Sequence, residues 1–404
     1  PVLQLEVAMN TNRREFLAGA AALTLAGTLA QNRPLFAEKK KYKACVIGDT
    51  NQGGYGHGLH LVWSGRDNIE VVGLADPDPE GRKKHAEEAG ANNTYADYRE
   101  MLDKEKPDLV SIGPRWTIHH KEYLLACASA GAHGYLEKPI STDLAEADAM
   151  VEAVQSKNLK WSIAHQKRMC PDVQLAKKLI FEDGLIGDVL ELRGRGKEDH
   201  RAGGEDLIVL GTHIFDLMLY FMGRAHWCAS NIAVDGKPAT KSDVHQPSEP
   251  LGPILGNQIQ STFGFDNAVP GFFATRKNKD GNGGRWGLDI YGSKGIVKIR
   301  MEVFPEIYWK ETSSWLPTGE NQKPWVRLPG HVELSGDDPS SIMNAFAIDD
   351  LLEAIEEDRQ PGVSLESGRD SYEMIQAVYA AYINGGRIDL PLEDRRHPLV
   401  AWSE

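Results

Sequence analysis

A glycine-rich segment, GDTNQGGYGHG at residues 48–58, directly follows a short apolar stretch. After a strand, a G-x-G-x-x-G turn lets backbone N–H groups approach a pyrophosphate closely. Gly48 and Gly53 fall on the first and third positions of this fingerprint, but Thr50 replaces the middle glycine. The segment therefore predicts a lengthened dinucleotide-binding loop that leads into a helix; a glycine-rich turn of another kind is the alternative.

A carboxylate ends the next apolar stretch. Asp76 closes the segment IEVVGLAD at residues 69–76. At the end of a second parallel strand, a carboxylate can accept both ribose hydroxyls of NAD and would repel the 2′-phosphate of NADP. We therefore expect NAD rather than NADP. The alternative is a helix N-cap, because Pro77 follows and would stand at the first helical position.

A lysine stands between a carboxylate and a proline in YLEKPIS, residues 135–141. Lys138 falls at the C-terminal end of a predicted parallel strand, where such sheets bind their ligands. Near a nicotinamide's positive charge, its ammonium can donate to a substrate hydroxyl and fall in pKa as oxidation proceeds. A solvated surface lysine is the alternative.

Alternating strands and helices position these residues. We expect strands at 44–48, 69–76, 107–113 and 132–139. Helices are expected between them at 78–90 and 120–131, the second closed by Gly131. This alternation predicts an α/β fold with a doubly wound parallel sheet.

The pattern changes after about residue 190, where strands are joined directly by turns. Residues 292–295, Gly-Ser-Lys-Gly, mark one hairpin. Two helices are expected near the end, at 342–358 and 368–385. The second half therefore predicts a largely antiparallel sheet with helices on one face.

The segments EKPIS, GDTNQGG, LAD, PDLVSIG and HKEYLLACASAGAHGYL together resemble the Gfo/Idh/MocA oxidoreductase family, as do HQKRMCP, LIGDVLELRGRG, GTHIFDLMLYFMG and GRIDLPL further on. The resemblance spans about residues 42–391. It implies a Rossmann domain over 42–160 and a C-terminal α/β domain with an open sheet over 161–391, followed by a tail at 392–404. It also implies tightly held NAD(P) and sugar, inositol or related polyol substrates.

Some family roles carry over residue by residue. Lys138 matches the catalytic lysine, and Glu137 matches the neighbour that contacts the nicotinamide ribose. His213, in GTHIFD, matches the histidine that serves as acid or base, which suits removal of a hydroxyl proton near neutral pH. Asp216 lies three residues later and can orient His213, or it can be a plain second-shell or surface carboxylate.

One position departs from the family pattern. Many members carry aspartate four residues before the histidine, where this chain has Val209. Asp206, three residues earlier, is the nearest carboxylate, and the usual lysine, aspartate and histidine set is incomplete. Arg168 matches a position that faces the cleft, and His120 matches the histidine of a cofactor-binding segment after the third strand.

Composition excludes some classes of function. A net charge of −13 leaves no basic surplus for nucleic acid or an anionic membrane. The four cysteines, at positions 45, 127, 170 and 228, form no CxxC pair and are expected to be mostly core thiols. The adjacent His119 and His120 lack a third ligand at suitable spacing, so no metal site is expected.

The N-terminal region reads as an export signal. Arg13 and Arg14 precede an apolar run over 16–30, too short to span a bilayer. The pattern fits a twin-arginine signal peptide within residues 1–30, followed by an arm over 31–41, with Met9 as the natural start. We therefore expect the twin-arginine export machinery as a partner, a periplasmic location and no membrane span in the mature form.

An exported nicotinamide enzyme needs a cofactor that stays bound and is reoxidised in place. The main hypothesis is an NAD-dependent oxidoreductase acting on a sugar or polyol hydroxyl. The first alternative is the internal redox cycle of the NAD-dependent glycoside hydrolases and lyases of the same family. The second is a non-catalytic exported binding protein, which Val209 favours and the retained Lys138 and His213 oppose.

Aromatic residues and the second sheet suggest further features. Trp286, Trp309, Trp315 and Trp325 could stack on sugar rings, although core packing explains any one of them equally well. In the family that the chain resembles, the exposed face of the second sheet often pairs subunits. A homodimer or homotetramer is therefore the expectation.

Overall fold

A computed structural model describes residues 40–277, 284–316, 319 and 322–404. Residues Tyr42–Glu404 form one compact unit. The expected signal peptide, and all but the last two residues of the expected arm, lie outside the described residues. Among the described helices, none is long and apolar enough to cross a membrane.

The first domain is built on six parallel strands in the order β3-β2-β1-β4-β5-β6. The strands are β1 (Tyr42–Ile47), β2 (Ile69–Ala75), β3 (Asn93–Tyr95), β4 (Leu109–Ile112), β5 (His133–Leu136) and β6 (Trp161–Ile163). All four residues of β4 are buried, as expected of a parallel strand covered on both faces. The doubly wound sheet is confirmed, and β6 carries it past the expected domain boundary at residue 160.

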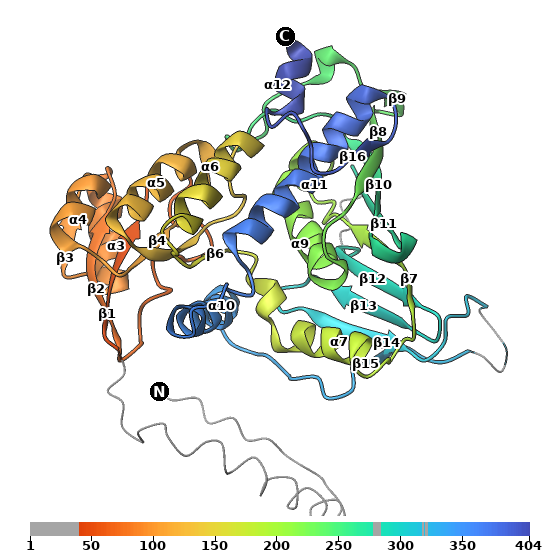
Figure 1. The fold of residues 1–404 in the computed structure, drawn as a ribbon, viewed down its shortest axis with the longest axis horizontal. Helices are drawn as coiled ribbons and strands as arrows, with labels where there is room; N and C mark the ends of the chain where they lie inside the picture. Colours follow the sequence, from red (N-terminus) through yellow and green to blue (C-terminus); the bar gives the residue numbers. More distant parts are fainter. Residues whose placement is uncertain (1–39, 278–283, 317–318, 320–321) are drawn as a thin grey trace, which may run out of the picture. The chain divides into compact units, whose positions relative to one another are not determined.

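Four helices flank this sheet (Figure 1): α3 (Pro79–Ala89), α4 (Tyr98–Glu105), α5 (His120–Ala130) and α6 (Leu144–Gln155). Helix α3 starts at an N-cap, Asp78, whose side chain accepts a bond from the Gly81 N–H. Helix α5 ends at Gly131 in the left-handed conformation, as predicted. The predicted helices at 78–90 and 120–131 are confirmed, whereas the short β3 and α4 were not foreseen.

Between β1 and β2 the expected helix is absent from the described residues, and residues 48–68 form a succession of turns. Gly53, Gly54, Gly56 and Gly58 all have φ between +54° and +85°. That backbone conformation is incompatible with a right-handed helix. The expectation of a helix directly after the glycine-rich loop is therefore wrong, because four glycines adopt left-handed turns there.

The second domain carries a ten-stranded sheet with the order β15-β14-β13-β12-β7-β11-β10-β8-β16, and β9 beside β8. Only β7 and β11 pair in parallel among neighbours, so the sheet is largely antiparallel, as predicted. Its strands are β7 (Val189–Arg195), β8 (Trp227–Val234), β9 (Lys237–Pro238), β10 (Gln258–Gly264), β11 (Pro270–Arg276), β12 (Gly287–Gly292), β13 (Ile296–Arg300), β14 (Glu306–Lys310), β15 (Val326–Arg327) and β16 (Ile388–Asp389). The hairpin at 292–295 joins β12 to β13 and is confirmed.

Helices cover one face of this sheet: α7 (Pro171–Phe181), α8 (Gly204–Val209), α9 (Gly211–Met222) and α11 (Leu365–Asn384). The remaining helices are α10 (Pro339–Glu356) and α12 (Pro398–Ser403). The predicted helices at 342–358 and 368–385 are confirmed as α10 and α11.

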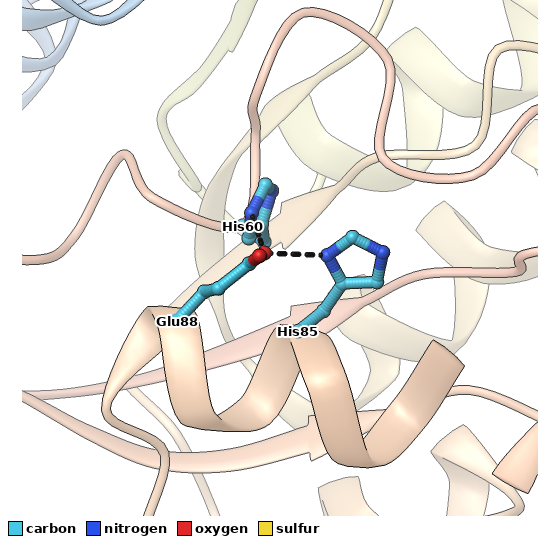
Figure 2. Close-up of side chains that lie close together, drawn as sticks. All are labelled: His60, His85 and Glu88. Carbon is cyan, nitrogen blue, oxygen red and sulfur yellow. Dashed lines mark hydrogen bonds and ion pairs between the residues drawn. The ribbon is translucent and has the colours of Figure 1, made fainter. Parts of the chain in front are cut away.

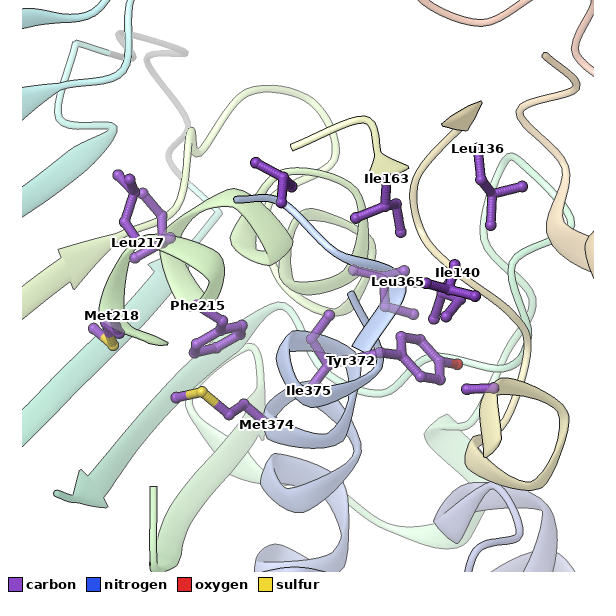
Figure 3. Packing of buried hydrophobic residues seen from close by; sticks show 14 of the residues in the cluster. Leu136, Ile140, Ile163, Phe215, Leu217, Met218, Leu365, Tyr372, Met374 and Ile375 are labelled. Carbon is purple, nitrogen blue, oxygen red and sulfur yellow. The ribbon is translucent and has the colours of Figure 1, made fainter. Parts of the chain in front are cut away.

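The two domains share one apolar core. Figure 3 shows Leu136 and Ile163, from β5 and β6, near Leu365 and Tyr372 of α11. Phe215 of α9 belongs to the same buried cluster. The four cysteines are all free and buried, as predicted. This continuous core packs the two domains directly against each other.

Candidate active site

A cavity of about 300 Å³ lies where the two domains meet. It contains both residues predicted to be catalytic, Lys138 from the first domain and His213 from the second. The other lining residues are His57, Arg115, Gln166, Lys167, Lys197, Arg201, Val209, Leu210, Trp286, Val303, Pro339, Ser340 and Met343. The fold therefore brings together two residues 75 positions apart in the sequence, as the resemblance implied.

Lys138 follows β5 and is joined to Pro139 by a cis peptide bond. Its ammonium donates a hydrogen bond of 3.0 Å to the carbonyl oxygen of Val209. Burial lowers the pKa of Lys138 to about 8, against the opposing effect of the Glu137 carboxylate. Val209 thus supplies a backbone acceptor where a side-chain carboxylate was expected, and Lys138 can exchange a proton near neutral pH.

His213 stands in the first turn of α9 and is 6% exposed. Burial, and then the charge of Lys138, hold the pKa of its imidazole well below the ordinary value. Its Nδ1 is buried and has no hydrogen-bond partner among the described residues. The lowered pKa keeps the ring a neutral imidazole, which is the protonation state that a general base requires.

Glu137 is held by His57, a residue that the sequence reasoning missed. The Glu137 carboxylate accepts a bond of 3.0 Å from the His57 backbone N–H and lies 2.9 Å from the His57 Nδ1. Burial raises the pKa of Glu137, but the contacts with His57 outweigh it and lower the pKa to about 2. The G-x-G-x-x-G fingerprint assigns no side-chain role to position 57. The only indication in the sequence is that a histidine occurs within the glycine-rich segment.

A second cavity, of about 220 Å³, lies at the carboxyl ends of β1 and β2. Gly48 lines it, and a side chain at Gly48 would collide with the Tyr55 ring, 2.0 Å from a Cβ there. Its other lining residues are mostly apolar or aromatic and include Pro77, Tyr98 and Tyr123. A small, partly aromatic pocket at this edge of a parallel sheet fits the adenosine end of a dinucleotide.

Asp76 is buried beside this cavity but does not line it. Its Oδ2 accepts bonds from the Thr50 N–H at 3.1 Å, the Thr50 hydroxyl at 2.7 Å and the Tyr55 hydroxyl at 2.7 Å. Asp76 therefore ties the glycine-rich loop to β2, and Thr50 takes part in that tie. The N-cap alternative for Asp76 is wrong, because Asp78 caps α3.

Family comparisons agree with this geometry. The model for the oxidoreductase family with an NAD-binding Rossmann fold matches residues 43–165, and the model for its C-terminal α/β domain matches residues 193–390. The chain belongs to the Gfo/Idh/MocA oxidoreductase family. The match to the first model extends through β6, in agreement with the sheet.

Named relatives of this Gfo/Idh/MocA protein include two dehydrogenases. Levoglucosan dehydrogenase of Pseudarthrobacter phenanthrenivorans is 27% identical over 259 residues, which cover 58% of this chain and 66% of that enzyme, just under two thirds of its length. D-apiose dehydrogenase of Paraburkholderia graminis is 23% identical and covers 89% of this chain and 93% of the enzyme. A solved levoglucosan dehydrogenase in complex with NADH and levoglucosan superposes with a TM-score of 0.70 at 22% identity, over 87% of this chain and 100% of that one. This superposition shows the shared fold.

Asp216 does not orient His213, in contrast to the prediction. Its carboxylate accepts a bond of 3.1 Å from the Arg168 Nε and lies 3.3 Å from the His165 Nδ1. Arg168 was expected to face the cleft, but its guanidinium is buried in this ion pair and does not line the catalytic cavity. Both side chains instead fix α9 against the 3₁₀ turn η2 (Gln166–Met169), which carries Lys167.

Asp206 also acts from behind the cavity. It accepts bonds of 3.2 Å from the backbone N–H groups of Lys197 and Glu198, and one from the Thr275 hydroxyl. It does not line the cavity and so does not replace the missing family aspartate. Its effect is to shape the turn that places Lys197 in the cavity wall.

His120, predicted to contact the cofactor, is completely enclosed. Its Nδ1 lies 3.1 Å from the Ile140 carbonyl oxygen and its Nε2 2.7 Å from that of Pro114. The ring thus joins the loops after β4 and β5. Gly53 lies close to the first of these loops, with a Cβ position only 2.8 Å from the Arg115 Cβ. His120 and Gly53 therefore position the loops that line the site.

A possible metal site lies elsewhere, although none was expected. His60, His85 and Glu88 gather between the glycine-rich segment and α3 (Figure 2). The Glu88 Oε2 lies 3.1 Å from the His60 Nε2 and 2.9 Å from the His85 Nδ1. These three ligand atoms could hold a metal ion, and no member of the set lines the catalytic cavity. Only the 85–88 pair on α3 is visible as a spacing in the sequence.

Proposed function

We propose that the protein is an exported, NAD-dependent oxidoreductase that oxidises a hydroxyl of a sugar or polyol with a tightly held cofactor. The observation that carries the proposal is the meeting of Lys138 and His213 in one cavity, beside Glu137. The dehydrogenases among the relatives support the choice of substrate class.

The residues present fit a dinucleotide. Gly48 lines the small pocket at β1 and β2, and Glu137 follows β5 next to Lys138, at the nicotinamide end of such a site. A bound NAD would supply the hydride acceptor, the C4 position of its nicotinamide, for oxidation of the substrate carbon. Gly53 and Gly56 would bring loop N–H groups close to the pyrophosphate.

The chain's own residues manage the proton. The Lys138 ammonium donates a hydrogen bond to the substrate hydroxyl oxygen and orients it. His213 accepts the hydroxyl proton on its neutral imidazole as the carbon loses hydride, which leaves a ketone and an imidazolium. The alcohol thus loses one hydride and one proton, and the two are received by different partners.

The first experiment asks whether the cofactor is captive. The mature protein is purified from the exported fraction without added cofactor, its N-terminus is determined by mass spectrometry, and the denatured supernatant is assayed for nicotinamide nucleotide. We expect a terminus beyond residue 30 and near-stoichiometric NAD. An uncleaved cytoplasmic protein would refute export, and a protein that neither holds nor binds NAD would refute the enzyme and favour a binding protein.

A second candidate is the redox-assisted glycoside hydrolase or lyase. The twin-arginine pattern at Arg13 and Arg14 favours it equally, because the hydride returns to the substrate and no second reactant is needed. Release of a free sugar from a glycoside without net reduction of NAD would identify this activity.

We also propose a homo-oligomer paired through the uncovered face of the second sheet. A hollow of about 730 Å³ lies on this sheet, lined by β7, β8, β10, β11, β12 and β13. Light scattering of the purified protein at two concentrations tests this, with a dimer or tetramer mass expected and a monomer mass contradicting it.

A further inference from the structure

The catalytic cavity is lined by positive charge. Five of its lining residues are cationic side chains, namely Arg115, Lys138, Lys167, Lys197 and Arg201. Among the described residues that line it, no aspartate or glutamate occurs. The whole chain carries a net charge of −13, so the cavity differs in sign from the molecule around it. A neutral sugar does not require such a wall.

Two of these cations are held by carbonyl groups rather than carboxylates. Lys138 donates to the Val209 carbonyl, and Lys167 donates to those of Met301, at 3.3 Å, and Glu302. Burial lowers the pKa of Lys167 to about 8, as it does for Lys138. The carboxylates of Glu137 and Glu302 act on Lys138 and Lys167, respectively, and raise their pKa values. Neither carboxylate forms an ion pair with its lysine in the described structure, so a desolvated ammonium here would gain from an added anion.

The other three cations share few acidic partners. Asp199 lies 2.6 Å from an Arg201 nitrogen and 3.7 Å from the Lys197 Nζ, so one carboxylate serves two cations. Arg115 pairs with Glu249. Neither Asp199 nor Glu249 lines the cavity, and the Glu137 carboxylate is engaged by His57. The lining of the catalytic cavity therefore carries more cationic than anionic side chains.

An aromatic wall stands next to the cations. The Trp286 ring has the Lys167 Nζ 4.7 Å and the Lys197 Nζ 5.8 Å from its centroid, and the His213 ring lies 6.0 Å away. A sugar ring can stack on an indole face while a charged substituent reaches the ammonium groups beside it. The same wall leads toward His213, where the oxidised hydroxyl would lie.

We propose that the substrate is an anionic sugar or polyol whose carboxylate or phosphate is bound by Lys167, Lys197 and Arg201 while its reacting hydroxyl meets Lys138 and His213. This inference rests on the proposed function. The pyrophosphate of the cofactor is a poor candidate for these charges, because the three residues belong to the second domain and none of them lines the nucleotide pocket.

The test uses the full mature protein loaded with NAD. Glucose, gluconate, glucuronate and glucose 6-phosphate, with the galactose counterparts, are compared by calorimetric titration and by the fluorescence of bound NADH. We expect at least a tenfold preference for an anionic compound over its neutral counterpart, weakening as salt is raised. The carboxylate and phosphate arms show which anion is preferred.

Variants locate the anion. Lys197→Gln and Arg201→Gln should each raise the KM or dissociation constant for the preferred anionic compound about tenfold and reduce its preference over the neutral one. Lys178→Gln, an exposed lysine on α7, is the matched control and should leave both values unchanged. NAD content is measured in every variant and should not fall.

Each outcome decides between the two proposals. Tighter binding of anionic compounds without any oxidation would uphold the inference and contradict the dehydrogenase. Oxidation or binding without an anionic preference would overturn the inference and leave the dehydrogenase standing. A loss of NAD from Lys197→Gln and Arg201→Gln would assign the charges to the cofactor and overturn the inference as well.

Discussion

The predicted cofactor-binding residues of the first domain and the second-domain wall of the catalytic cavity differ in how far their polar groups are bonded within the protein. On the first-domain side, Asp76 accepts three hydrogen bonds from the glycine-rich loop, and Glu137 is engaged by His57. On the second-domain side, Lys167 donates to the carbonyl groups of Met301 and Glu302, while Lys197 and Arg201 share the Asp199 carboxylate. The cofactor side is thus organised in advance by internal hydrogen bonds. On the substrate side, the three cations Lys167, Lys197 and Arg201 have one ion-paired carboxylate, Asp199, between them among the described residues.

The largest expected effect comes from the residue that joins both sides. Lys138→Met removes the donor to the substrate oxygen while keeping an apolar side chain of similar length. We expect kcat to fall by about 10³-fold with NAD still bound. The measurement is single-turnover reduction of the bound cofactor, with NAD content as the control. Retention of more than a tenth of the wild-type rate would contradict the role given to Lys138.

The pH dependence gives the next effect. The pKa of Lys138 is lowered to about 8, so its ammonium is present below that pH and is lost above it. If the ammonium is the required donor, kcat should fall about tenfold per pH unit above pH 8. Lys138→Arg keeps the charge at all accessible pH values and should remove this descending limb, even with a lower maximum. An unchanged limb in Lys138→Arg would assign it to another group, such as Lys167.

The glycine-rich loop offers a matched pair. Gly56 and Gly58 both have positive φ, +54° and +80°, but a Cβ on Gly56 would lie 2.1 Å from the Glu137 Oε2, whereas one on Gly58 meets nothing within 4 Å. Gly58→Ala should lower the free energy of unfolding by about 1–2 kcal/mol. Gly56→Ala should cost about 1.5–3 kcal/mol more, because it also displaces His57 from Glu137. Urea unfolding checks this, and equal losses would show that the contact with Glu137 is unimportant.

The smallest effect is expected from Tyr55→Phe. It deletes one of the three donors to the Asp76 Oδ2 and leaves the two from Thr50. We expect a loss of about 1 kcal/mol in the free energy of unfolding and a measurable weakening of NAD retention. Tyr308→Phe is the control, since its partner Glu306 is 45% exposed and water can replace the bond. A neutral Tyr55→Phe would show that Asp76 does not need Tyr55 to hold the loop.

The two catalytic residues could be predicted from the sequence, Lys138 from its local context and His213 from the family resemblance. Lys138 was predictable because a lysine directly after a short apolar strand must lie at the ligand-binding edge of a parallel sheet. His213 required the family resemblance, since a single histidine at the start of a helix has no distinguishing spacing. Both lie in the cavity, as expected.

Competition from distant segments explains the failures. Asp216 has the right helical spacing to reach His213, but Arg168 and His165 come from another segment and occupy its carboxylate. His120 was assigned to the cofactor from its motif, yet two carbonyl groups enclose it. His57 went unnoticed because its partner, Glu137, is 80 residues away. Spacing along a chain cannot show which of several possible partners a buried side chain will take.

The return of α10 to the first domain has a consequence for biosynthesis. The Asn344 side chain donates a 3.0 Å bond to the His57 carbonyl oxygen, 287 residues earlier, and accepts one of 2.9 Å from the Tyr135 hydroxyl. The nucleotide loop therefore gains this contact only after residue 344 has left the ribosome. A chain that ends before α10 would therefore have a nucleotide loop that lacks this supporting contact.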